Sequence, residues 1–206
     1  RFKRGGGETV ANMPISVCGP GTGLGVANLV PVSIAGKSQW HCVSGEGGHI
    51  DFAPVGELEI TVLRYINTIK DRVSYEQLLS GYGLEQIHQA LVNADPEDDD
   101  AHLSAQEISK RGTENTCIMC KQALLIFCQV LGSFAGNLAL IMNSQGGVYI
   151  AGGIVPRFIE FLKASKFRER FESKGRLSHI TQQAPTYVIT EEQPGLLGAA
   201  AYLLQS

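Results

Sequence analysis

The sequence lacks any excess of basic residues. Its 206 residues include 17 Lys and Arg against 20 Asp and Glu, which gives a formal net charge of −3. Proteins that bind nucleic acid through a broad surface carry a basic patch, and this balance does not provide one. We therefore expect no nucleic-acid partner. Hydrophobic residues make up 44% of the chain, which is enough to form the core of one globular domain.

Charge is also absent from one long apolar stretch, residues 123–142, which is long enough to cross a membrane. Polar residues recur within it every four positions, at Gln129, Ser133 and Asn137, and two glycines lower its helix propensity. This pattern favours a buried helix that packs closely against its neighbours through its glycines. No apolar leader precedes it near residue 1. We therefore expect a soluble, cytoplasmic protein with no membrane partner.

The sequence lacks an even set of cysteines, and a chain of this length does not need disulfides to be stable, so we expect no disulfide framework. The five cysteines include one C-x-x-C pair, Cys117 and Cys120. A zinc site would need a second pair or nearby histidines, and none follows this pair at a suitable spacing. A thioredoxin-like redox motif is a further interpretation. Two reduced thiols, one helical turn apart, explain the pair more simply.

Glycine, by contrast, is abundant, with 24 residues, and its first cluster is GPGTGLG at residues 19–25. The cluster is not a dinucleotide-binding G-x-G-x-x-G, because the third glycine is missing, and no Gly-Lys-Ser/Thr follows as in a P-loop. Alternate glycines expose backbone N–H groups to an anion, and Thr22 adds a hydroxyl at the tip. We favour a phosphate-binding hairpin over a plain turn.

Two further glycine loops carry candidate binding residues. Residues 44–49 (SGEGGH) set the carboxylate of Glu46 and the imidazole of His49 on flexible backbone, a pair that suits the hydroxyls of a polyol. Half a metal site or a surface ion pair is an equally good interpretation. Gly152 and Gly153 follow a short apolar run, where a diphosphate can lie against the backbone at a helix start.

The remaining pattern predicts alternating strands and helices. We expect strands at 14–18, 26–32, 148–151 and 187–190, and helices at 57–69, 84–92 and 123–142. Capping boxes at 74–77 and 104–107 mark two helix starts. Residues 1–13 show no periodicity and are predicted to be an irregular lead-in. Mixed elements joined by glycine loops indicate an α/β or α+β domain.

Together these segments resemble bacterial-type glucokinases of the actin-like sugar kinase superfamily. The resemblance lies in GPGTGLGVANLV (19–30), SGEGGHIDFAP (44–54), LSGYGL (79–84), GGVYIAGGIVPRF (146–158) and QPGLLGAA (193–200). It implies an α/β fold, the actin-like ATPase (ribonuclease H-like) large domain, with a mixed sheet flanked by helices. On this basis residues 14–206 form the C-terminal large domain, with a terminal helix at about 195–204, and 1–13 lead in from a missing N-terminal domain.

The resemblance also implies a reaction, the ATP-dependent and Mg²⁺-dependent phosphorylation of glucose to glucose 6-phosphate by a homodimer. It implies three sugar-binding residues: Glu46, His49 and Glu76. It further implies five nucleotide-binding residues: Gly21, Thr22, Gly23, Gly152 and Gly153. Without the resemblance, Glu76 is better explained as a carboxylate that complements a helix N-terminus. The Cys117 and Cys120 pair lies where such enzymes can carry one.

Two parts of the family's catalytic machinery are not found in this sequence. These are the catalytic Asp of an Asn-Asp motif and the Asp-Gly-Gly-Thr-type phosphate loop that carries the Mg²⁺ carboxylate. Asp51 belongs to the structural stretch DFAP, so we do not assign it as the base. We therefore expect no catalytic or metal-binding residue in this chain, and no activity from the chain alone. A related hexose or N-acetylhexosamine kinase and a non-catalytic sugar-sensing regulator remain as alternatives.

Overall fold

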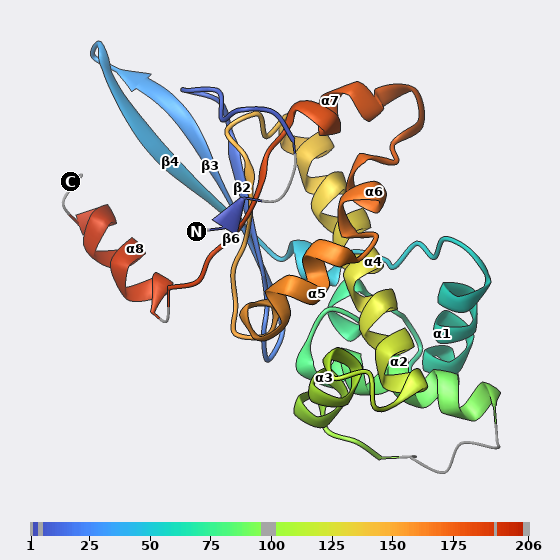
Figure 1. The fold of residues 1–206 in the computed structure, drawn as a ribbon. Helices are drawn as coiled ribbons and strands as arrows, with labels where there is room; N and C mark the ends of the chain where they lie inside the picture. The colour runs from blue at the N-terminus through green and yellow to red at the C-terminus, as the bar shows by residue number, and fades with distance from the viewer. Residues whose placement is uncertain (1, 4–5, 96–101, 192, 204–206) are drawn as a thin grey trace.

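The protein forms one mixed sheet with helices around it, as seen in a computed structural model that describes residues 2–3, 6–95, 102–191 and 193–203 (Figure 1). The described strands lie in the order β1-β6-β5-β2-β3-β4. Their bounds are β1 Phe2–Lys3, β2 Ile15–Pro20, β3 Leu24–Ile34, β4 Lys37–Gly45, β5 Val148–Ile150 and β6 Thr186–Val188. The predicted strand positions are confirmed, while β1 and β4 were not predicted.

The sheet combines a local antiparallel part with a parallel part built from distant segments. Strands β2, β3 and β4 form an antiparallel meander, in which Cys18 pairs with Val26 and Leu29 pairs with Cys42. Strand β5 pairs in parallel with both β2 and β6. Strand β1 pairs antiparallel with β6. The prediction that residues 1–13 are wholly irregular is therefore wrong, because two of them extend the sheet.

Helices cover the sheet and continue beyond it into a helical part. The bounds of the α-helices are α1 Glu57–Asn67, α2 Gly81–Ala94, α3 Ala105–Thr113, α4 Ile118–Met142, α5 Ile159–Ala164, α6 Phe167–Glu172, α7 Ser178–Gln183 and α8 Pro194–Leu203. Short 3₁₀ helices are η1 Gly47–His49, η2 Tyr75–Gln77, η3 Val155–Phe158 and η4 Gly175–Leu177. Helices α4 to α7 lie on one side of the strands and α8 lies on the other side (Figure 1).

Helix α4 is the centre of the core. It is long and apolar enough to cross a membrane, but 72% of its most apolar 18-residue window is buried inside the protein. A Cβ on Gly132 would lie 2.2 Å from the Phe167 carbonyl oxygen, and one on Gly136 would lie 2.4 Å from that of Phe171. The two glycines thus let α6 lie directly against α4. The prediction of a buried helix that packs through its glycines is confirmed.

A buried ion pair fixes α1 to α6 across the surface of α4. Glu59 on α1 is 2% exposed, and its carboxylate accepts hydrogen bonds from the Arg170 guanidinium at 2.7 and 3.2 Å. The Val55 N–H donates to the same carboxylate at 2.8 Å. Ser133 of α4 accepts two further bonds from Arg170, at 2.8 and 3.0 Å. All three elements are therefore held by one hydrogen-bonded charge pair.

The two predicted capping boxes have different outcomes. Ser104 accepts from the Glu107 N–H, and the Glu107 carboxylate accepts from the Ser104 N–H at 3.0 Å, so the box at the start of α3 is confirmed. Ser74 makes no side-chain capping bond, and it precedes the three-residue η2 instead of an α-helix. The prediction at 74–77 is wrong because the chain turns again at Ser80, which caps α2 through the Gly83 N–H.

Candidate functional site

The glycine loop after β4 lies against the segment that carries Glu76. The Phe52 N–H donates to the Val73 carbonyl at 3.0 Å, and the Tyr75 N–H donates to the Ile50 carbonyl at 3.1 Å. These two bonds hold η1 and η2 side by side. Tyr75 is 2% exposed and packs edge-on against Phe52, with ring centroids 5.6 Å apart. Burial raises the pKa of the Tyr75 hydroxyl, so this side chain is a neutral anchor for η2.

Glu76 connects two of the predicted binding loops. Its Oε2 accepts a hydrogen bond from the Leu24 N–H at 2.9 Å, directly after the first glycine turn. Its Oε1 lies 3.6 Å from Nε2 of His49, which projects from η1. The side chains of His49 and Glu76 are partly exposed, at 56% and 31%. The structure therefore brings these two predicted sugar ligands together, at a place where a ligand from solvent can reach both.

Glu46 lies at the start of η1, where it is exposed. Its carbonyl accepts the His49 N–H at 3.0 Å, so the backbone of one predicted sugar residue holds the other. Gly48 is required behind them, because a Cβ there would lie 2.2 Å from the Leu24 carbonyl oxygen. The loop thus lies directly on β3, which fixes its distance from the glycine turn that precedes β3.

Arg72 also holds this loop, although nothing in the sequence pattern predicted it. Its guanidinium donates to Asp51 Oδ1 at 2.6 Å and to the His49 carbonyl at 2.8 Å. Asp51 is therefore engaged in an exposed ion pair, consistent with leaving it out as a base. The only available signal for Arg72 was its charge, because its role depends on a contact between segments that are distant in sequence.

The first glycine cluster forms the turn between β2 and β3. The Gly21 N–H donates to the Gly23 carbonyl at 2.8 Å, and the Gly21 carbonyl accepts the Gly81 N–H at 2.9 Å from the first residue of α2. Within the described part of the chain, the N–H groups of Thr22 and Gly23 have no hydrogen-bond acceptor. These two groups, rather than that of Gly21, are thus available to an anion. Thr22 is exposed at the tip.

The second glycine pair lies beside this turn. Gly152 has φ +84°, and a Cβ there would lie 2.2 Å from the Pro20 carbonyl oxygen, so the turn after β5 lies directly on the end of β2. A Cβ on Gly153 would meet nothing within 4 Å. The predicted nucleotide residues are therefore adjacent in the structure, although more than half of the chain separates them.

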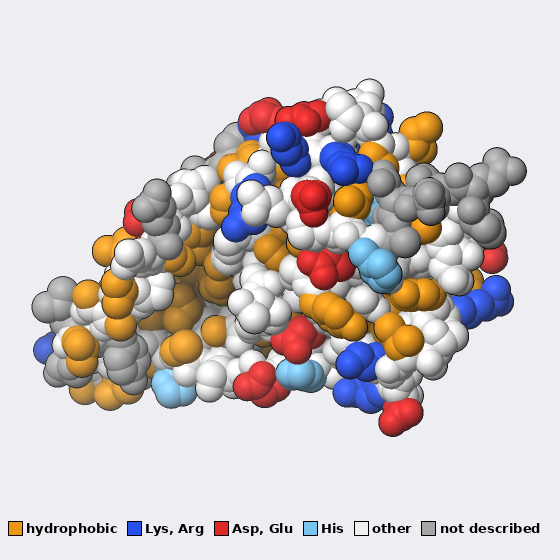
Figure 2. Space-filling model, turned by 90° about the horizontal axis from the view of Figure 1, so that it is seen from below, with side chains coloured by type: hydrophobic (Ala, Val, Ile, Leu, Met, Phe, Trp, Pro, Cys, Tyr) orange, Lys and Arg blue, Asp and Glu red, His pale blue; other side chains and the backbone are white. Residues whose placement is uncertain are grey.

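A cavity of about 550 Å³ extends from the glycine pair towards α8. Its walls are formed by Gly152, Gly153, Pro156, Arg157, Thr190, Glu191 and Pro194. Seen from this side, the molecule is hollowed between its main body and the part that carries α8, with hydrophobic side chains on the walls (Figure 2). Arg157, Thr190 and Glu191 were not predicted as site residues, because they come together here only through the parallel pairing of β5 with β6.

Cys18 lies in β2, just before the turn between β2 and β3, and its thiol is buried. It is 0% exposed in β2, and burial raises the pKa of its thiol to about 12. The thiol is therefore neutral and packs as a small apolar side chain. The arrangement offers a carboxylate and imidazole pair whose chemistry suits hydroxyl groups, and two N–H groups whose chemistry suits an anion.

Comparison with known proteins gives a consistent result. The model of the glucokinase family matches residues 2–206. A glucokinase from Colwellia psychrerythraea is 60% identical over 209 residues, which cover 100% of this chain. The chain spans only 62% of that protein's length. A glucokinase from Pectobacterium atrosepticum is 51% identical over 98% of this chain, which spans 61% of that protein's length.

Solved structures show the same fold. A glucokinase from an Antarctic psychrotroph has a TM-score of 0.89 at 38% identity, over 100% of this chain and 62% of that one. A Balamuthia mandrillaris glucokinase in complex with glucose has a TM-score of 0.80 at 25% identity, over 97% of this chain and 56% of that one. A ROK family glucokinase from Streptomyces griseus, in complex with glucose and AMPPNP, has a TM-score of 0.61 at 19% identity. The match covers 94% of this chain and 61% of that one, and it shows a shared fold. The predicted actin-like ATPase fold, with its mixed sheet flanked by helices, is confirmed.

Proposed function

Because this chain belongs to the glucokinase family, we propose that the whole protein transfers the γ-phosphoryl group of ATP to glucose. This chain then supplies the sugar site and part of the nucleotide site. The observation that carries the proposal is the position of Glu76, whose two carboxylate oxygens face His49 and the Leu24 N–H. One side chain thus links a loop suited to a polyol with a turn suited to phosphate.

The proposed roles follow from the chemistry of each group. Glu46, His49 and Glu76 receive and donate the hydrogen bonds of sugar hydroxyls, because carboxylates accept and imidazole can do either. The N–H groups of Thr22 and Gly23 hold phosphate oxygens at the tip of the turn. The cavity beside Gly152 and Gly153 takes the adenosine. Glucose and AMPPNP in the structural neighbours support these assignments by analogy of fold.

Two elements of the reaction are assigned to parts of the protein outside this chain. Sugar phosphorylation needs a base for the attacking hydroxyl, and a positioned base contributes about 10²–10⁴ in rate. Asp51 faces Arg72 at 2.6 Å, and Glu76 is held by Leu24 and His49. For Mg²⁺, the described residues offer no cluster of carboxylates around the phosphate turn. We therefore assign no step through Mg²⁺ to this chain, and we propose that the chain alone does not turn over.

A coupled assay for glucose 6-phosphate tests the proposal. In the intact protein, Glu46→Gln should raise KM for glucose by about 10- to 100-fold, because a hydrogen bond to a charged group contributes about 1.5–3 kcal/mol. KM for ATP should change little. The matched control is Glu57→Gln, an exposed carboxylate at the start of α1. Unchanged KM and kcat for Glu46→Gln would exclude that residue from the sugar site.

The same assay tests the remaining alternatives. This chain on its own should give no product, and normal turnover from it would contradict the assignment of the base to another part. A sugar-sensing regulator would bind glucose without forming product, and a kinase for another hexose would prefer that sugar in competition. We further propose that the intact protein is a cytoplasmic homodimer, and light scattering tests its oligomeric state.

A further inference from the structure

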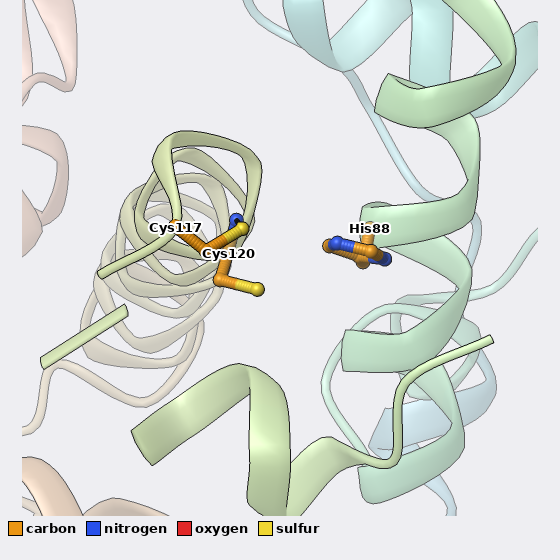
Figure 3. A group of neighbouring side chains, drawn as sticks. All are labelled: His88, Cys117 and Cys120. Atoms are coloured by element: carbon orange, nitrogen blue, oxygen red, sulfur yellow. Dashed lines mark hydrogen bonds between the residues drawn. The ribbon is translucent and has the colours of Figure 1, made fainter. Parts of the chain in front are cut away.

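The cysteine pair at the start of α4 faces a histidine of α2. The sulfur atoms of Cys117 and Cys120 and a ring nitrogen of His88 all lie within 4.8 Å of one another. His88 projects from α2 towards the two sulfurs (Figure 3). His88 and Cys120 are fully buried, and Cys117 is half-buried. The sequence has no histidine at a suitable spacing after the pair, but the fold brings one from before it.

We propose that His88, Cys117 and Cys120 bind a zinc ion. Two thiolates and an imidazole are the donors that Zn²⁺ prefers. With Zn–S near 2.3 Å and Zn–N near 2.0 Å, tetrahedral ligand atoms lie about 3.5–3.8 Å apart. The three ligand atoms, all within 4.8 Å of one another, have to approach by about 1 Å to reach this spacing, and we propose that side-chain rotation on binding supplies that movement. A water molecule or a fourth ligand takes the remaining position, on the solvent side of Cys117.

The backbone around the pair suits bound thiolates. Cys117 is the N-cap of the 25-residue helix α4, where the helix dipole favours negative charge. The Cys120 N–H donates to Cys117 Sγ at 3.2 Å. This bond holds the Cys117 sulfur against the first turn of α4, from which Cys120 also projects. Binding of Zn²⁺ converts the two thiols to thiolates and releases two protons to solvent, while the neutral imidazole keeps its second ring proton.

The site is rigid because α3 packs against the start of α4. A Cβ on Gly112 would lie 2.9 Å from the Cys120 carbonyl oxygen, so the two helices touch through backbone at this point. Asn115, with φ +61°, turns the chain between them. The ligands therefore come from elements that other contacts already hold, which lowers the ordering cost of metal binding.

Zinc at this position would join α2 to α4, about two helical turns along α2 from the end that contacts the glycine loop between β2 and β3. The first residue of α2, Gly81, donates its N–H to the Gly21 carbonyl at 2.9 Å. His88 lies seven residues further along the same helix. The role of the zinc is therefore structural, in that it fixes the helix on which the phosphate turn rests. It is separate from the sugar and nucleotide loops and does not depend on the proposed function.

The test is metal binding by the intact protein, prepared reduced and without a polyhistidine tag. Elemental analysis should find one zinc per chain. Co²⁺ added to the metal-free protein should give the sulfur-to-cobalt charge-transfer band in the near ultraviolet. The decisive variant is Cys117→Ser, because serine is itself a preferred N-cap and so preserves the start of α4. Cys42→Ser removes an exposed thiol on β4 and is the matched control.

We expect Cys117→Ser and His88→Asn to weaken Zn²⁺ binding by more than about 100-fold, because even loss of an outer partner of a ligand costs 10–100-fold. Zn²⁺ should raise the Tm of the wild-type protein and of Cys42→Ser, but not that of Cys117→Ser. Absence of stoichiometric zinc or cobalt in the reduced wild-type protein would overturn the proposal. Binding by Cys117→Ser at the wild-type affinity would also overturn it.

Discussion

Replacing Gly132 of α4 by alanine tests whether close helix packing or helix propensity decides stability at that position. In an exposed helix this change stabilises by about 1 kcal/mol. Here the new Cβ would lie 2.2 Å from the Phe167 carbonyl oxygen and 3.0 Å from its carbonyl carbon. Both are backbone atoms, so no side-chain rotation can relieve the contact.

The magnitude follows from the displacement that α6 must make. Ordinary contact begins at 3.4 Å, so the Phe167 carbonyl has to retreat by about 1 Å. The side chains of Phe167 and Phe171 are 1% and 0% exposed, and they would lose packing as α6 moves. Overpacking of this kind costs up to about 3 kcal/mol, and subtraction of the propensity gain leaves a net loss of about 2 kcal/mol.

Urea unfolding of the intact protein, followed by circular dichroism, measures this loss. The midpoint should fall while the slope with denaturant stays unchanged. Gly198→Ala is the matched control, because Gly198 lies in α8 with nothing within 4 Å of its added Cβ, and it should cause no loss. A Gly132→Ala protein as stable as the wild type would refute the reasoning, since α6 would then have adjusted at no cost.

Two further predictions concern buried charge. Glu59→Gln should destabilise the protein by about 3–5 kcal/mol in the same unfolding assay, because it leaves the Arg170 guanidinium without its counter-charge. The control Glu57→Gln, at an exposed position of α1, should leave the stability unchanged. Burial, with a smaller contribution from Arg170, lowers the pKa of Lys174 from 10.5 to about 8. Between about pH 8 and 10.5 the unfolded chain therefore binds more protons than the folded one. The free energy of unfolding should rise with pH over this interval. Lys174→Met should remove this rise, whereas the exposed Lys166→Met should keep it, and equal pH profiles for the two variants would show that Lys174 does not cause the rise.

Much of the fold could be predicted because its signals are local. The glycine cluster at 19–25 predicts the hairpin of β2 and β3, and the uncharged run at 123–142 predicts most of α4. Strand β4 was missed because it is an edge strand that is largely exposed, so its side chains show little of the alternation that burial imposes. Strand β1 was missed because two residues carry no period.

The candidate site, like the fold, could be predicted only where its signals are local in the sequence. The predicted loops were found because glycine, carboxylate and imidazole lie within a few residues of one another, as at Glu46 and His49. The contact of Glu76 with the Leu24 N–H has no such signal, because η2 and β3 meet only in the folded chain. His88 is a second contact without a local signal, because α2 brings it to Cys117 and Cys120 only in the folded chain. Local spacing thus identified groups capable of binding, and the fold decides which of them act together.

The order of strands in the sheet has a consequence for synthesis of the protein. The meander of β2, β3 and β4 is complete by Gly45, but the partner on the other edge of β2 is β5, which begins at Val148. At about 5–20 residues per second, a ribosome needs roughly 5–20 s to make the intervening chain. During that interval the backbone of β2 is an open strand edge on the nascent chain. The growing protein thus exposes the strand that leads into its first glycine turn until α4 and then β5 have been made.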